Sequence, residues 1–190
     1  VVTEDEDSAE KWRDNLQAIL GEGIVRYFPA WDVEVYDGRS PDSEITALRV
    51  EAAGRLLRGD PTVVVAPANA LLTPVIPPFA LELSTVELHA GEERDLDELT
   101  THLNDCGFER VPMIDGIGQY SVRGGILDVY PYDTEHPFRL EFFGDEIESI
   151  RRFDTGTQRS LEPVEAVSLL PVREVVLTPE FVAEFGDKLQ

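Results

Sequence analysis

The sequence predicts an α/β protein in two parts: a partial parallel-sheet domain over residues 1–80, then an α+β, mainly antiparallel domain over residues 81–172. In the first part, strand-like and helix-like runs alternate, as they do in an open α/β sheet. In the second, short apolar runs follow one another with brief turns, the pattern of antiparallel pairing. The prolines at positions 74, 77 and 78 suit a boundary between the two. We expect residues 173–190 to return to the first domain.

The first predicted elements are a strand that ends at Val1-Val2-Thr3 and a helix capped by Asp7 or Ser8. Because nothing precedes the strand, we expect the chain to be a piece of a longer protein. Gly21 ends the helix, since glycine readily adopts the conformation that follows a helix C-terminus. Apolar residues recur at helical spacing and form the expected buried stripe: Ala9, Trp12, Leu16, Ile19 and Leu20.

A second strand, a helix and a third strand follow. Ile24–Phe28 is a short apolar run and therefore a candidate buried strand. Ser40 is the expected cap of the next helix, with Pro41 in its first turn and Gly59 at its end. The run Thr62–Ala66 is dominated by β-branched residues, which is typical of a parallel strand buried on both faces. The helix between these strands has an apolar stripe made of Ile45, Leu48, Ala52 and Leu56.

The second domain begins with a predicted strand at Leu81–Leu88 and a helix that starts after Asp95. The Asp95 carboxylate faces the first amides of that helix, and Gly107 ends it. A helix is also expected to start near Thr178. The remaining predicted strands are Phe108–Ile114, Gln119–Arg123, Ile126–Tyr130, Phe138–Phe143, Glu146–Phe153 and Val164–Leu170.

The charge of the chain argues against two classes of partner. With 38 acidic and 16 basic residues the formal charge is −22, and so acidic a surface repels nucleic-acid phosphates and anionic membranes. No apolar run approaches the roughly 18–20 residues that span a bilayer, and the N-terminus has no signal segment. We expect a cytoplasmic protein that contacts no membrane.

The basic residues leave two interpretations open. Only Lys11 and Lys188 are lysines, and the other 14 basic residues are arginines. An acid-rich, lysine-poor surface suits a protein that stays dispersed in concentrated salt, where charges are screened over about 3 Å. It also suits an ordinary acidic protein from a GC-rich genome.

The sequence gives little support for enzyme chemistry. It contains no glycine-rich phosphate loop that ends in Lys-Ser or Lys-Thr, and no nucleophile elbow. The histidines His89, His102 and His136 are far apart, and Cys106 reads as a small buried residue. A single cysteine excludes an internal disulfide and a multi-cysteine metal site. We therefore expect no catalytic residue, metal or cofactor.

One predicted strand has an unusual outer face. Alternation along Phe138–Phe143 turns Phe138, Leu140 and Phe142 to the core and leaves Arg139, Glu141 and Phe143 outside. A solvated face is normally polar, yet this one presents an aromatic ring beside an arginine. Gly144-Asp145 predicts a tight hairpin. Its register would pair Phe142 with Ile147, Phe143 with Glu146 and Glu141 with Glu148.

The strand Gln119–Arg123 has a comparable pattern. Tyr120 and Val122 are expected to face inward, and Gln119, Ser121 and Arg123 outward. The glycines at 124 and 125 allow a turn or bulge that re-aims Arg123. Arginine and aromatic residues often anchor protein interfaces. Alternatively, the two arginines only offset neighbouring carboxylates and Phe143 packs under a loop.

Several motifs resemble one known family. They occupy the runs Gly107–Pro112, Gly118–Pro131, Phe138–Arg151, Phe153–Leu161 and Leu169–Glu174, and they resemble the module shared by the excision-repair subunit UvrB and the bacterial transcription-repair coupling factor. Upstream, Phe28–Asp32 and the helix after Ser40 are similar to the coupling factor. The resemblance implies a degenerate helicase-like first domain and a docking domain at 81–172.

The resemblance also implies a function. In this family the β-rich domain docks onto UvrA, the damage-recognition ATPase, and the interface positions correspond to Arg123, Arg139 and Phe143. Other regions of the full-length factor, an ATP-dependent translocase, bind RNA polymerase and DNA, and can mask the docking surface. The alternative is a fragment of an ATP-dependent UvrB-type damage-verification subunit. The stretch Tyr27–Ser40 is too short for the DNA-clamping hairpin of UvrB, and the acidic charge also disfavours such a clamp.

Overall fold

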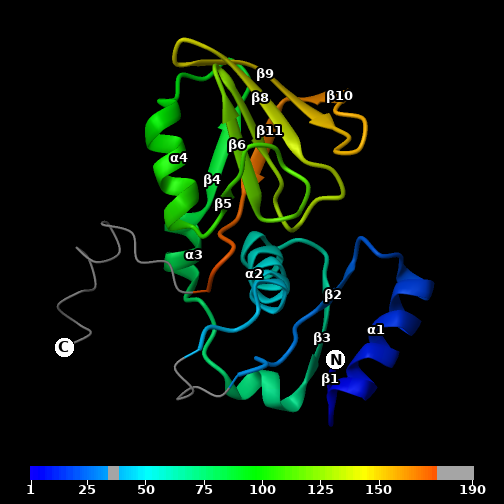
Figure 1. Ribbon diagram of the computed structural model, residues 1–190. Coiled ribbons are helices and arrows are strands. Elements are labelled where there is room, and N and C mark those ends of the chain that lie inside the picture. The colour runs from blue at the N-terminus through cyan, green and yellow to red at the C-terminus, as the bar shows by residue number, and fades with distance from the viewer. Residues whose placement is uncertain (34–38, 175–190) are drawn as a thin grey trace, which may run out of the picture. The chain divides into compact units, whose positions relative to one another are not determined.

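The computed structural model describes residues 1–33 and 39–174 of the chain. These residues divide into two compact units: Val1–Leu81 with Arg173 and Glu174, and Glu82–Val172. Figure 1 shows the helices and strands of both units and labels most of them. The helix predicted near Thr178, and the segment 173–190 beyond Glu174, lie outside the described residues.

The first unit contains a parallel sheet, as predicted. Its strands are β1 (Val2–Thr3), β2 (Val25–Tyr27) and β3 (Val63–Pro67), and they lie in the order β1-β3-β2. The central strand β3 is followed by the short 3-10 helix η1 (Ala68–Leu72). A three-stranded parallel sheet is compatible with many α/β folds, so the helicase-like assignment stays a prediction.

Helix α1 (Glu6–Leu20) begins earlier than the sequence pattern suggests. Its N-cap is Asp5, whose carboxylate accepts a hydrogen bond from the backbone N–H of Ser8 at 2.8 Å. Gly21 ends the helix with a φ of +90°. The predicted buried stripe is mostly wrong. Ala9 is buried and Leu16 packs beside it, but the other three are exposed; these are Trp12, Ile19 and Leu20.

Helix α2 (Ser43–Arg58) is capped by Asp42 instead of Ser40, because the Asp42 carboxylate accepts from the backbone N–H of Glu44 at 2.8 Å. Gly59 ends the helix in the left-handed conformation, as predicted. Leu56, expected in the core, is exposed. The buried face is rotated onto small residues and one arginine: Thr46, Ala47, Arg49, Val50, Ala52 and Gly54.

The second unit contains a six-stranded sheet and a separate two-stranded one. In the larger sheet the order is β10-β9-β8-β7-β6-β5, and every neighbouring pair is antiparallel except β5–β6. The smaller sheet pairs β4 with β11. The strands span Val86–His89 (β4), Glu109–Arg110 (β5), Gln119–Arg123 (β6), Ile126–Val129 (β7), Phe138–Phe143 (β8), Glu146–Phe153 (β9), Ser160–Val164 (β10) and Ala166–Leu169 (β11).

Two strand predictions need correction. Helix α3 (Pro78–Ser84) takes up part of the run predicted as the strand Leu81–Leu88, because proline is well placed in a first helical turn. The strand predicted at Phe108–Ile114 is reduced to β5, and Pro112 lacks the N–H that a longer ladder needs. The predicted strand Val164–Leu170 is confirmed as β11, which pairs with β4 in the smaller sheet.

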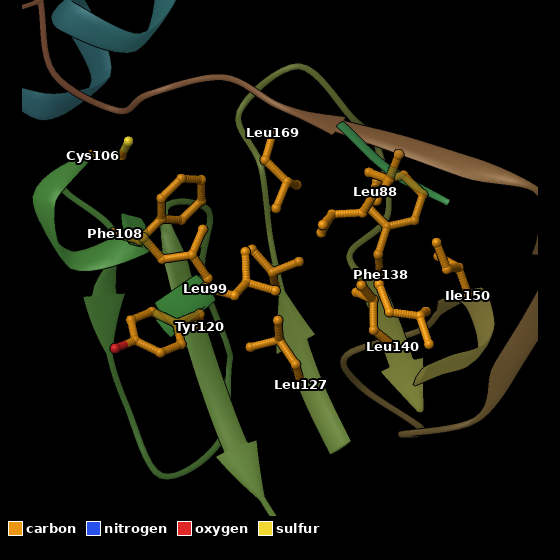
Figure 2. Packing of buried hydrophobic residues seen from close by; sticks show 14 of the residues in the cluster. Leu88, Leu99, Cys106, Phe108, Tyr120, Leu127, Phe138, Leu140, Ile150 and Leu169 are labelled. Carbon is orange, nitrogen blue, oxygen red and sulfur yellow. The ribbon is translucent and has the colours of Figure 1, made fainter. Parts of the chain in front are cut away.

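The core of the second unit lies between helix α4 (Leu96–Asp105) and the larger sheet. The α4 cap is the predicted one, because Asp95 accepts hydrogen bonds from the N–H groups of Asp97 and Glu98 at 2.8 and 2.9 Å. Figure 2 shows the packing of this core. Its buried members include Leu88, Leu99, Phe108, Tyr120, Leu127, Phe138, Leu140, Ile150 and Leu169.

Candidate partner-docking surface

The side of the six-stranded sheet away from this core carries the residues singled out in the sequence, and we call it the outer face. Phe138 and Leu140 are buried in the core, whereas Phe143 is 79% exposed. The predicted hairpin register is confirmed at its tip, where Phe142 lies opposite Ile147 and Phe143 opposite Glu146. A large aromatic ring therefore projects into solvent. A partner that covered this ring would remove its apolar surface from water, which is favourable.

The predicted contact between Glu141 and Glu148 is wrong, because β9 carries an irregularity at that point. Glu141 lies opposite Ser149, so Glu148 is an extra residue on β9. The Ser149 hydroxyl donates a hydrogen bond to Glu141 Oε2 at 2.8 Å. The bulge thus replaces a repulsive carboxylate pair with a hydrogen bond.

Ser121 faces the outer side as predicted, since it lies opposite Asp128. It is nevertheless buried, because the loop between β5 and β6 covers it. The Ser121 hydroxyl donates to the carbonyl oxygen of Pro112 at 2.9 Å. The outer face is therefore open only in part.

A buried carboxylate connects the two predicted arginines. Asp128 on β7 lies opposite Arg139 on β8, and its side chain is on the outer face although only 1% of the residue is exposed. Arg139 donates from Nε to Asp128 Oδ1 at 2.7 Å and from Nη2 to Oδ2 at 2.9 Å. Arg123 donates from Nη2 to the same Oδ2 at 2.9 Å. The hydrogen bond to Asp128 raises the pKa of Arg139, which remains a cation.

The two arginines differ in exposure. The Arg139 side chain is 13% exposed, and its guanidinium carbon lies 4.5 Å from the centre of the Phe153 ring. The Arg123 side chain, on the last residue of β6, is 47% exposed. Alternation predicted that Arg139 projects freely beside Phe143, and the burial of its side chain shows that it does not. The arginines offset a carboxylate, as one of the two sequence interpretations expected, but Phe143 does not pack under a loop. The role of these residues in an interface stays a prediction.

Glycines fix the two hairpins that border the open part of the outer face. Gly124 and Gly144 have φ values of +60° and +63°, which β-carbon sterics disfavour for other residues. A Cβ on Gly125 would lie 2.7 Å from the carbonyl oxygen of Phe142, so β7 and β8 approach closely there only because the residue is glycine. These turns hold Arg123 and Phe143 at the same end of the sheet, since Arg123 lies opposite Ile126 and Ile126 opposite Glu141.

Comparison with known proteins identifies the second unit. Residues 86–174 match the UvrB interaction domain family. They belong to this family. Over 189 residues the chain is 31% identical to the transcription-repair-coupling factor of Bacillus subtilis (strain 168), and over 174 residues it is 33% identical to that of Escherichia coli (strain K12). The match to the factor of Myxococcus xanthus is 36% over 187 residues.

These matches cover 92–100% of the chain but only 15–16% of each relative. The chain is therefore related over nearly its whole length to a small part of the coupling factors. The resemblance inferred from the motifs is confirmed. The sequence patterns did not single out Asp128, the carboxylate in the UvrB interaction domain that accepts from both arginines. Its position between the inward-facing Leu127 and Val129 could have indicated that it lies on the outer face beside the two arginines.

Sites for metal or membrane are not evident in the described chain. Over residues 1–33 and 39–174, no group of three or more His, Cys, Asp or Glu side chains could hold a metal ion. Nor does any described helix combine the length and apolarity needed to cross a membrane.

Cys106 in the UvrB interaction domain is buried, as predicted. Its Sγ lies 3.3 Å from the carbonyl oxygen of Ser84 and 3.2 Å from His102 Nε2. Burial, with a smaller effect of Asp105, raises the pKa of the thiol to about 12. Thiols react as thiolates, so this arrangement does not supply a nucleophile at neutral pH.

We expect Cys106 to resist thiol reagents in the folded chain. At pH 8 a thiol with a pKa of about 12 is ionised roughly a thousandfold less than a free thiol. Labelling with a chromogenic disulfide should be slow in buffer and complete within minutes in denaturant. Fast labelling in buffer, with the fold intact by circular dichroism, would contradict the buried position.

Proposed function

We propose that this chain is a non-catalytic interaction module of a transcription-repair coupling factor and that it recruits UvrA to sites of stalled transcription. The family of residues 86–174 and the names of the relatives support the coupling role. The observation that carries the UvrA assignment is the exposed Phe143 at the same end of the outer face as Arg123.

The chemistry of the outer face suits a protein partner. An exposed aromatic ring and a half-exposed arginine are the residue types that most often dominate binding energy at interfaces. In a chain of charge −22, Arg123 and Arg139 on the outer face both pair with one buried carboxylate, Asp128, and Arg151 lies opposite Arg139 on β9. A partner with carboxylates around an apolar recess would complement it.

The proposal also assigns a different role to each part of the chain. Residues 1–80 would be a partial, degenerate helicase-like domain, 81–172 the docking domain and 173–190 a segment that returns to the first domain. Hydrogen bonds that Glu174 accepts from Arg49 and Trp31 support this return. Contacts with RNA polymerase and DNA, and ATP-driven movement, would belong to the parts of the full-length factor outside this chain.

The proposal is tested by measuring the affinity of the chain for purified cognate UvrA by isothermal titration calorimetry. Phe143→Ala removes the apolar anchor, and Arg123→Glu reverses the exposed charge. Each is expected to weaken binding by about 30-fold or more, which corresponds to about 2 kcal/mol at an interface hot spot. Arg139→Glu should also weaken binding, but it places a second carboxylate against Asp128 and therefore disturbs the fold as well.

Matched variants in the first unit serve as controls. Trp12→Ala removes another exposed aromatic ring, and Arg58→Glu reverses another exposed arginine. Both should bind UvrA as the unmodified chain does. The UvrA assignment fails if Phe143→Ala and Arg123→Glu bind as tightly as these controls.

A further inference from the structure

The burial of Asp128 calls for an explanation beyond stability. Removing a carboxylate from water costs several kcal/mol, and a buried ion pair is often no more stabilising than apolar residues of similar volume. Asp128 nevertheless lies in the middle strand of the β6–β7–β8 set, with three hydrogen bonds of 2.7–2.9 Å from two arginines. A buried carboxylate of this kind fixes the orientation of the two arginine side chains, because the positions of its oxygens determine where the donating nitrogens lie.

The donors of the two arginines are used differently. Arg139 donates from both Nε and Nη2 to Asp128, its Nη2 also lies 3.5 Å from Gln158 Oε1, and its guanidinium lies over the Phe153 ring, so its side chain is held at several points within the domain. Arg123 gives Asp128 only Nη2, and within the described residues its Nε and Nη1 make no other hydrogen bond. Arg123 is thus tethered at one nitrogen while the rest of its guanidinium faces solvent.

This arrangement reduces the entropic cost of docking. A free arginine on a strand end samples many rotamers, and a partner that binds it must immobilise the side chain at a cost in conformational entropy. The hydrogen bond to Asp128 holds the Arg123 side chain before any partner arrives. Arg139 on the neighbouring strand pairs with Asp128, so the carboxylate that holds Arg123 is itself fixed in position.

We propose that Asp128 is a positioning residue of the docking surface, which holds Arg123 in a fixed orientation so that its remaining donors meet a carboxylate of the partner. The inference rests on the proposed function, because it concerns the same contact with UvrA. It assigns partner contact to Arg123 and Phe143, and a supporting role to Asp128 and Arg139.

A double-mutant cycle tests this role. UvrA affinity is measured for the unmodified chain, Asp128→Asn, Arg123→Ala and the combination, at a temperature well below the melting point of each. We expect Asp128→Asn to weaken binding by about 3- to 10-fold in the unmodified chain and to have no further effect once Arg123 is alanine. A merely structural role would give the same loss in both backgrounds.

Two further variants make the result decisive. Glu162→Gln neutralises another carboxylate that pairs with an arginine of this sheet, Arg152, and should leave the affinity unchanged. If Asp128→Asn does not fold, Asp128→Glu retains the charge but displaces it by one methylene. It should give the same loss and the same dependence on Arg123.

The outcomes separate the two proposals. If the unmodified chain binds UvrA and Asp128→Asn binds equally well, the positioning role is wrong and the proposed function stands. Equal losses with and without Arg123 also overturn the positioning role. If the unmodified chain does not bind UvrA, both proposals fall.

Discussion

Arg49→Met is expected to lower the free energy of unfolding of the first unit by about 3–5 kcal/mol, the cost of breaking a buried ion pair from one side. The Arg49 side chain on α2 is 0% exposed. Its Nε donates to Glu174 Oε1 at 2.9 Å, and Nη1 and Nη2 donate to the carbonyl oxygens of Pro29 and Pro74 at 2.8 Å each. The variant leaves a buried carboxylate and two carbonyl groups without these donors.

Urea denaturation followed by tryptophan fluorescence measures this loss, since Trp31 donates to Glu174 Oε2 at 2.6 Å and lies beside Arg49. Arg58→Met on the same helix is the matched control. Its partner Asp60 is partly exposed, so the control should lose at most about 1 kcal/mol. Adding Glu174→Met to Arg49→Met should recover part of the loss, because the uncompensated charge is then gone. Equal losses for Arg49→Met and Arg58→Met would show that the buried network is not important for stability.

Leu140→Ala is expected to destabilise the second unit by about 2–5 kcal/mol, as large-to-small changes in a packed core do. Leu140 is 0% exposed and lies on β8, opposite Leu127 on β7 and Ile150 on β9. All three belong to the core shown in Figure 2. The truncation leaves a cavity in the layer that supports the outer face.

Chemical denaturation followed by far-ultraviolet circular dichroism measures this second effect. Leu161→Ala on β10 is the control, because Leu161 is 39% exposed and should lose about 1 kcal/mol or less. Below its unfolding transition, Leu140→Ala should keep most of its affinity for UvrA, since Leu140 lies on the inner face. A loss of binding as large as that of Phe143→Ala in a fully folded sample would contradict the division between core and docking faces.

Much of the outer face follows from local rules in the sequence. Period-two alternation in Phe138–Phe143 assigned Phe138 and Leu140 to the core and Phe143 to solvent. The two-residue turn Gly144-Asp145 set the register of the hairpin at its tip. The caps at Asp95 and Gly59 were also predictable, since each depends on residues within one helical turn.

The exposure and pairing of charged groups depended on segments far apart in the chain. Arg139 donates to Asp128, which is 11 residues away in the sequence, and Arg49 donates to Glu174, which is 125 residues away. The cover over Ser121, the extra residue Glu148 on β9 and the rotated buried face of α2 likewise have no local signature.

The sequence by itself therefore determined the direction in which side chains leave the backbone, because steric preferences act over a few residues. Tertiary structure alone decided which of those side chains are covered and which carboxylate each arginine meets. Burial and ion pairing depend on the distance to groups that only the folded chain brings together.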